Sequence, residues 1–125
     1  MGKYVVSKND KGQFHFKLLA GNNEPILRSQ TYAAKKSALN GIESVTKNAP
    51  EAPVVDLTAK NVAEEKNPKF EIFGGKDGKF YFRLLAANGQ NIGSSEGYNS
   101  LASCKNGIKS VKKNAVSETV EEEED

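Results

Sequence analysis

At 125 residues, of which 37% are hydrophobic, the chain is long enough for one domain whose core needs no disulfide or structural metal. It has one cysteine, Cys104, and one histidine, His15, which excludes a disulfide framework, a CxxC redox pair and a Cys/His zinc site within one chain. No apolar run approaches the ~18 residues of a membrane span and the N-terminus lacks a secretory signal, so we expect a soluble cytoplasmic protein.

The net charge of +2 conceals a basic body and an acidic end. Residues 118–125 hold six of the 16 acids and none of the 18 lysines and arginines, so residues 1–117 carry 18 positive and ten negative charges, a net +8. An acidic run of this kind is typical of a disordered, solvating tail. We therefore expect 118–125 to be disordered, and to compete weakly with any polyanion that binds the basic body.

The chain consists of two copies of one unit. Shifting it by 66 residues aligns 3–49 with 69–115 without a gap, and 20 of the 47 paired residues are identical. We therefore divide it into repeat one at 3–57, a polar linker at 58–68 and repeat two at 69–117, which together are expected to form a single domain.

Each repeat begins with a predicted hairpin. Alternating apolar residues indicate strands at 3–8 and 69–74, and again at 13–20 and 79–86, with the Asp and Gly of a tight turn between them. A shorter third strand carries Ile26 in one repeat and Ile92 in the other. The inward face of the second strands consists of Phe14, Phe16 and Leu18 in repeat one and of Phe80, Phe82 and Leu84 in repeat two.

A helix follows the strands in each repeat, at about 34–48 and about 100–114, because apolar residues recur there at spacings of three and four. Ser100 is the predicted N-cap of the second helix, whereas Ala34 stands at the matching place in the first. Short segments at 54–57 and 116–120 are candidate fourth strands. The stripes expected to pack on the sheet are Ala38, Ile42 and Val45, and Leu101, Cys104, Ile108 and Val111.

The motifs F-x-F-x-L-x-A-x-N, S-x-x-Y and S-x-x-N-G-I-x-S-V-x-x-N-A occur in this order in both repeats and span nearly the whole chain. With these motifs the sequence resembles the YegP-like family of small, mainly bacterial proteins without an assigned function. The resemblance implies an α+β fold: two β-β-β-α-β repeats related by a pseudo-twofold axis form one antiparallel-rich sheet, with two helices packed on it and exchanged C-terminal strands. With both units in one chain, we expect a monomer that is an intramolecular pseudo-dimer. The longer linker and the acidic tail depart from the family pattern.

A glycine interrupts both predicted helices, at Gly41 and Gly107. Glycine in a helix costs ~1 kcal/mol relative to alanine, so its presence in both copies indicates that a side chain there would collide with a neighbour. Close packing against the sheet or against the other helix is the first interpretation. Close approach of a ligand to the bare backbone is the alternative.

A polar stripe runs beside the apolar stripe on each helix, at spacings of three, four and three residues. Serine, asparagine and lysine at this spacing are candidates for an interface or a ligand-binding surface, although a solvated helix face explains them equally. The residues of the two stripes are Ser37, Asn40, Ser44 and Lys47, and Ser103, Asn106, Ser110 and Lys113.

Catalytic residues do not occur in a recognisable arrangement. His15 lies on a predicted strand without a nucleophile to activate, and Cys104 lies on the apolar stripe as a small hydrophobe. The acids of the body are scattered, and the glycines at 74–78 are explained by a hairpin turn. We predict that the protein is not an enzyme and that it has no cofactor or metal site.

The outer face of the predicted sheet is cationic and partly aromatic. Positive charge interleaved with aromatic rings can hold single-stranded nucleic acid through phosphate contacts and base stacking, although an ordinary solvated strand face has a similar composition. The first functional hypothesis is therefore binding of nucleic acid or another polyanion. Its candidate residues are Lys17, Arg83, Arg28, His15 and Tyr81, with Lys3 and Lys69 nearby.

Two further hypotheses belong to other functional classes. The protein is alternatively a protein–protein interaction or structural module that uses helix faces or strand edges. A small-molecule binder or enzyme would instead require a pocket between the repeats, lined by Tyr32, Tyr98, Asn40 and Asn106. Salt-dependent retention on single-stranded DNA would favour the first hypothesis over the second.

The two-copy organisation predicts how an isolated repeat behaves. Residues 1–60 alone should dimerise or misfold, because one repeat exposes apolar surface that its twin covers in the intact chain. Light scattering on the fragment measures its size, and circular dichroism reports its folding. A well-folded monomer would mean that the repeats are independent domains.

Overall fold

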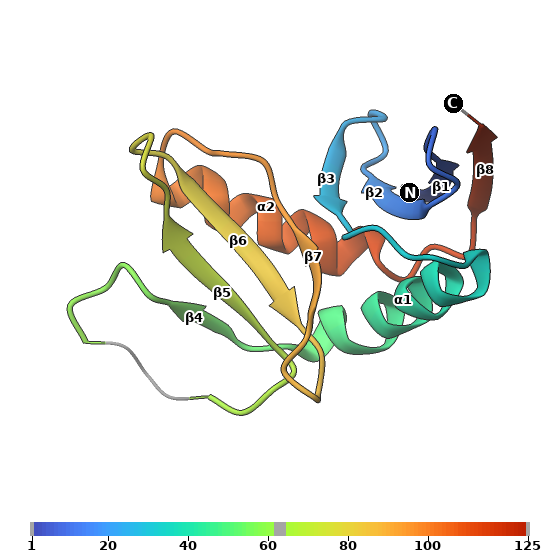
Figure 1. The fold of residues 1–125 in the computed structure, drawn as a ribbon. Coiled ribbons are helices and arrows are strands. Elements are labelled where there is room, and N and C mark those ends of the chain that lie inside the picture. Colours follow the sequence, from blue (N-terminus) through green and yellow to red (C-terminus); the bar gives the residue numbers. More distant parts are fainter. Residues whose placement is uncertain (1, 62–64, 125) are drawn as a thin grey trace.

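The computed structural model describes residues 2–61 and 65–124, in which the two repeats build one eight-stranded mixed sheet with two helices (Figure 1). The α+β class and the predicted helices are confirmed. Among these residues no helix is long and apolar enough to cross a membrane. Repeat one comprises β1 (Lys3–Lys8), β2 (Phe14–Leu19), β3 (Pro25–Arg28), α1 (Lys35–Asn48), a 3-10 turn (Ala49–Glu51) and β4 (Val54–Asp56). Repeat two comprises β5 (Lys69–Gly74), β6 (Phe80–Leu85), β7 (Asn91–Ser94), α2 (Leu101–Asn114) and β8 (Val120–Glu124), so it extends beyond the expected boundary at residue 117.

The repeats exchange their last strands. The order across the sheet is β4-β5-β6-β7-β3-β2-β1-β8, so β4 leaves repeat one and pairs in parallel with β5, while β8 leaves repeat two and pairs in parallel with β1. The two halves meet where β3 lies antiparallel to β7, with Arg28 opposite Ser94. Each half of the sheet therefore contains strands from both repeats, as the family resemblance implies.

The C-terminus differs from its prediction. Residues 118–125 were expected to be disordered and the last strand to lie at 116–120, but β8 begins at Val120 and pairs with β1 as far as Glu124. Parallel pairing uses backbone groups, which glutamates provide as well as apolar residues do. In addition, Lys3 and Lys35 form ion pairs with Glu121 and Glu122. The 66-residue offset between the repeats, applied to β4, places the equivalent strand at 120–122.

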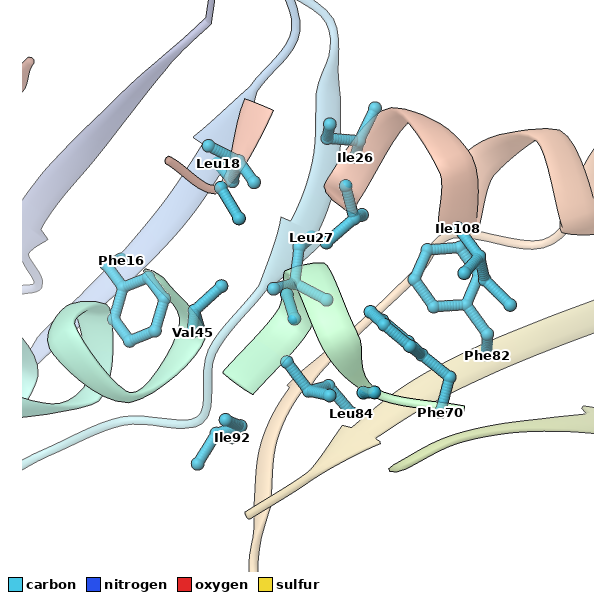
Figure 2. Packing of buried hydrophobic residues seen from close by; sticks show 14 of the residues in the cluster. Phe16, Leu18, Ile26, Leu27, Val45, Phe70, Phe82, Leu84, Ile92 and Ile108 are labelled. Atoms are coloured by element: carbon cyan, nitrogen blue, oxygen red, sulfur yellow. The ribbon is translucent and has the colours of Figure 1, made fainter. Parts of the chain in front are cut away.

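The inward-facing side chains of both repeats form one core. Figure 2 shows Leu27 between the core residues of the two halves, with Phe16 and Leu18 in one and Phe82 and Leu84 in the other. These aromatic and leucine side chains are buried, as the alternation along the second strands predicts. Helix α1 contacts β2 of its own repeat and β7 of the other, and α2 contacts β6 and β3, so the helices also cover both halves.

Leu27 and Gly93 occupy equivalent positions in the two repeats and complement each other at the centre of the sheet. Leu27 is 1% exposed, and a Cβ atom on Gly93 would lie 2.7–2.9 Å from three carbons of the leucine side chain. Two leucines would overfill this space, and two glycines would leave a cavity. The centre of the molecule is therefore shaped for one copy of each repeat.

Each helix glycine packs against a tyrosine of its own repeat. A Cβ atom on Gly41 would lie 2.8 Å from the hydroxyl of Tyr32 and from Cε2 of Phe16, and one on Gly107 would lie 2.7 Å from Cζ of Tyr98. The interpretation of both glycines as sites of close packing is confirmed. The neighbour is the tyrosine that precedes the helix, together with the second strand, and not the other helix.

Hydrogen bonds from the end of repeat two hold the N-terminal strand. The backbone N–H of Gly2 donates to Oδ1 of Asn114 at 2.8 Å, and Oγ of Ser117 donates to the carbonyl of Gly2 at 2.6 Å. The hydroxyl of Tyr4 donates to the carbonyl of Ala115 at 2.7 Å, and burial raises the pKa of Tyr4 to about 12. The first and last parts of the described chain are thus joined by buried polar contacts.

The complementarity of Leu27 and Gly93 predicts strong energetic coupling. Gly93→Ala should lower the free energy of unfolding by about 1–3 kcal/mol because the methyl group overfills the site. Leu27→Ala should lower it by about 2–5 kcal/mol through loss of packing. The double variant should lose less free energy of unfolding than the two single variants lose together, because the methyl group added at position 93 enters the space vacated at position 27. Urea unfolding of the four proteins measures the coupling, and strictly additive losses would contradict the shared packing.

The close packing of the helix glycines predicts that replacing one with alanine destabilises the protein, contrary to the order of helix propensities. Gly107→Ala should destabilise the protein by about 1–3 kcal/mol through the collision with Tyr98, although alanine is the better helix former. Gly74→Ala is the matched control, since a Cβ atom there has no neighbour within 4 Å among the described residues. Thermal unfolding compares the two variants with the wild type. A Gly107→Ala protein more stable than the wild type would rule out the packing explanation.

Candidate functional site

The structure brings three of the proposed polyanion-binding residues into one row on the outer face of the sheet, the face opposite the helices. Strand register places Lys17 beside Arg28, Arg28 beside Ser94, and Ser94 beside Arg83. Neighbouring strands are ~4.8 Å apart, so these side chains are close enough to share a ligand. From β4 to β8 the full row reads Val55, Glu71, Arg83, Ser94, Arg28, Lys17, Val5 and Glu121.

Carboxylates balance most of the positive charge in this region. Glu71 is central, because its side chain is only 12% exposed and accepts from Nε of Arg83 at 2.8 Å. Within the described residues, Lys17 is the proposed outer-face lysine or arginine without such an ion pair. The other pairs are Lys69 with Glu71 at 3.6 Å, Arg28 with Glu96 at 3.3 Å and Lys3 with Glu121 at 3.1 Å.

The aromatic groups of the outer face are engaged with protein neighbours. Tyr81 stacks on Phe73 with ring centroids 5.7 Å apart, and the guanidinium carbon of Arg83 lies 4.7 Å from the centroid of Phe73. The hydroxyl of Tyr81 donates to Asp77 at 2.5 Å, and this hydrogen bond raises the pKa of the tyrosine. His15 is half-buried opposite Ser7 of β1. One face of the Tyr81 ring is therefore already occupied.

The polar stripes of the helices divide into exposed and structural residues. Ser44 and Ser110 are half-buried and lie 3.1 and 3.2 Å from Nδ2 of Asn48 and Asn114, whose amides donate to them. Ser103 belongs to the N-cap of α2, because its backbone N–H donates to Oγ of Ser100, as predicted. The exposed members of the stripes are Ser37, Asn40, Lys47, Ser103, Asn106 and Lys113.

The proposed small-molecule pocket between the repeats has little support. Tyr32 and Tyr98 themselves fill the space beside the helix glycines, and burial raises the pKa of both. Asn40 and Asn106 are exposed. Cys104 is fully buried, and burial raises the pKa of its thiol to about 11, in agreement with its interpretation as a small hydrophobe. In the described part of the chain, no group of three or more His, Cys, Asp and Glu side chains is positioned to hold a metal.

A groove that the sequence analysis missed lies between α2 and the edge strand β4. We call it the basic groove; its volume is about 320 Å³, and it is lined by Val54, Asp56, Lys105, Ile108, Lys109 and Lys112. Val54 in this lining is 41% exposed, unlike the buried apolar residues of the core. None of the three lysines forms an ion pair with a side chain in 2–61 or 65–123. The groove therefore combines unneutralised positive charge with apolar surface.

The equivalent groove in the other half of the molecule carries the opposite charge. We call it the acidic groove; its volume is about 440 Å³, and it is lined by Ile42, Glu43, Thr46, Lys47, Val116, Ser117, Glu118 and Val120. Val116 and Val120 are 45% and 42% exposed. The repeat offset pairs Glu43 with Lys109 and Thr46 with Lys112. The charge difference was visible in the aligned repeats, but the grooves were not, because each lies between a helix of one repeat and an edge strand of the other.

The edge strands beside the two grooves present open backbone groups. On either side of β4, the carbonyl of Pro53 and the N–H of Leu57 form hydrogen bonds with β5. The backbone groups of the alternate residues, Val54 and Asp56, therefore point away from the sheet. In β8 the carbonyl of Thr119 accepts from Tyr4, so by the same alternation Val120 and Glu122 face outward. The side chains of these outward residues lie on the helix side, next to the grooves.

Known proteins of unassigned function are similar to this chain throughout its length. Residues 9–56 and 76–122 match the family model described as "Domain of unknown function (DUF1508)". A UPF0339 protein of Shewanella oneidensis and the UPF0339 protein YegP of Escherichia coli K12 are each 43% identical over 121 residues, which cover 97% of this chain and 96% of either relative.

The solved structures agree with the sequence relatives. The solution NMR structure of yegP from E. coli, described as a protein of unknown function, is 41% identical, has a TM-score of 0.81 and is similar over 98% of this chain and 93% of its own. The solution NMR structure of a UPF0339 protein from S. oneidensis is also 41% identical, with a TM-score of 0.79 over 98% of this chain and 92% of its own. The chain therefore belongs to the DUF1508 family, with the UPF0339 proteins YegP as its relatives.

Proposed function

We propose that the protein is a non-enzymatic interaction module that binds an extended acidic segment of a protein partner in the basic groove. The observation that carries this proposal is the convergence of Lys105, Lys109 and Lys112 with the exposed Val54 on the open edge of β4. An extended peptide can add to such an edge through its backbone while its side chains occupy the adjacent groove. The proposal develops the second hypothesis from the sequence, that of a module using strand edges and helix faces.

The composition of the groove favours an acidic, partly apolar segment. Lys105, Lys109 and Lys112 lie on one face of α2, at spacings of four and three residues. Their ammonium groups would attract carboxylates, while Val54 would contact an apolar side chain on the same peptide. Nucleic acid would use the lysines but would leave the valine and the strand edge without suitable partners. Peptide addition uses all three features.

Polyanion binding by the outer sheet face remains the second candidate function. Its support is the row that contains Arg83, Arg28 and Lys17. The ion pairs of Arg83 with Glu71 and of Arg28 with Glu96 reduce the net charge of that row. Because phosphate contacts depend on net positive charge, the basic groove should attract an anionic ligand more strongly than the outer sheet face does.

Binding of a labelled peptide tests the proposed function. A short fluorescent peptide of alternating valine and glutamate should bind, with an affinity that falls as salt is added. The triple variant Lys105→Glu, Lys109→Glu, Lys112→Glu should weaken binding about five- to a hundredfold, because each reversed charge contributes a few tenths to 1 kcal/mol. Fluorescence anisotropy measures both effects, with Lys113→Glu as the matched control on the same helix outside the groove lining.

Two further probes separate the mechanisms. The same peptide with all its central backbone nitrogens methylated has no N–H group to donate to the strand edge and should bind more weakly. An oligothymidylate that bound the wild type and lost affinity with Lys17→Glu, but not with the triple variant, would favour the outer sheet face. Failure of the valine–glutamate peptide to bind at low salt would disprove the proposed use of the groove.

A further inference from the structure

We infer that the acidic segment suited to the basic groove is the β8 edge of a second copy of this protein, so that copies associate head to tail. This inference rests on the proposed function of the basic groove and names its partner. It departs from the expectation of a monomer that the sequence analysis stated, because this contact joins whole chains.

The two ends of the sheet are complementary in charge. The basic groove has three lysines and one aspartate in its lining, whereas the acidic groove has two glutamates and one lysine. Both contain an exposed valine at the same position of the repeat, Val54 in one and Val120 in the other. Bringing the two grooves together would neutralise the lysines and cover apolar surface on both copies.

The strand directions also fit. Between β4 and β8 the sheet contains two parallel and five antiparallel steps, so β8 runs opposite to β4. Placed beside the β4 of a second copy in the same orientation, β8 would form an antiparallel pair that continues the sheet. Outward backbone groups of Val120 and Glu122 would then face those of Val54 and Asp56. The helices of both copies would lie on the same side.

Contacts between like edges are disfavoured by the same charges. Two β8 edges would bring together the glutamates of two acidic grooves, Glu43 and Glu118 in each, and two β4 edges would bring together the lysines of two basic grooves. Charged edge strands normally prevent pairing of sheets, and like charges across an interface cost free energy. The β4 edge is basic and the β8 edge is acidic. Repulsion therefore disfavours contacts between two β4 edges or two β8 edges, whereas a β4 edge and a β8 edge attract each other. Such a heterologous contact does not close on itself and produces open chains of copies.

Two complementary charge variants test this inference. One is Lys105→Glu, Lys109→Glu, Lys112→Glu, which makes both edges acidic; the other is Glu43→Lys, Glu118→Lys, which makes the acidic groove basic. At low ionic strength the sedimentation coefficient of the wild type should increase with concentration, and added salt should reverse the increase. Each variant alone should sediment as a monomer at every concentration. An equimolar mixture of the two should associate again, because acidic edges then meet basic edges.

Each result has a defined meaning. Circular dichroism and thermal unfolding first establish that both variants fold, as expected for changes at exposed or half-buried helix and loop positions. A wild type that stays monomeric at low salt, or variants that associate as strongly as the wild type, would overturn the inference. If the wild type is monomeric but binds the valine–glutamate peptide, the partner is a different protein and the proposed function stands. If the wild type neither associates nor binds the peptide, both proposals fail.

Discussion

Strands β4 and β8 each leave the repeat in which they begin and pair with the first strand of the other. The helix of each repeat carries the chain from its third strand to this distant position, α1 between β3 and β4 and α2 between β7 and β8. As a result, Tyr4 pairs with Val120 although almost the whole chain separates them. Two buried hydrogen bonds, one donated by Gly2 to Asn114 and one donated by Ser117 to Gly2, fix the same contact. Neither half of the sheet contains the strands of one repeat alone, and the shared core, the helix positions and both edge grooves depend on this exchange.

The two repeats share a fold, but their contacts have diverged where the halves meet and at the edges. Leu27 fills the space that Gly93 leaves, so the centre is asymmetric despite the pseudo-twofold arrangement. Tyr4 donates a hydrogen bond that Phe70, its counterpart in β5, lacks the hydroxyl to make. At the edges, charge has diverged while the apolar residue at the start of each final strand has not. The features that distinguish this molecule from a symmetric pair of repeats are therefore the differences between its two repeats.

Local patterns in the sequence predicted much of this fold. The alternation along the second strands and the three-and-four spacing of the helices identified their buried faces, because both depend on neighbouring residues alone. The partner of Gly107 could not be predicted in this way, since Tyr98 reaches the helix through a turn whose path the pattern does not define. Glu71 was missed as the partner of Arg83 because pairing across strands depends on register. The position of β8 was predictable from the repeat offset but was obscured by its acidic composition.

The pairing of a leucine with a glycine at the pseudo-twofold axis allows the two edges of the sheet to differ in sequence. A homodimer of a single repeat obeys strict symmetry, so its two outer edges are chemically identical and any change occurs at both. Joining two repeats in one chain removes that restriction, and the complementary pair at the centre favours the packing of two different repeats against each other. The sheet thereby acquires a polarity, with one basic and one acidic end, that no symmetric assembly of either repeat could have.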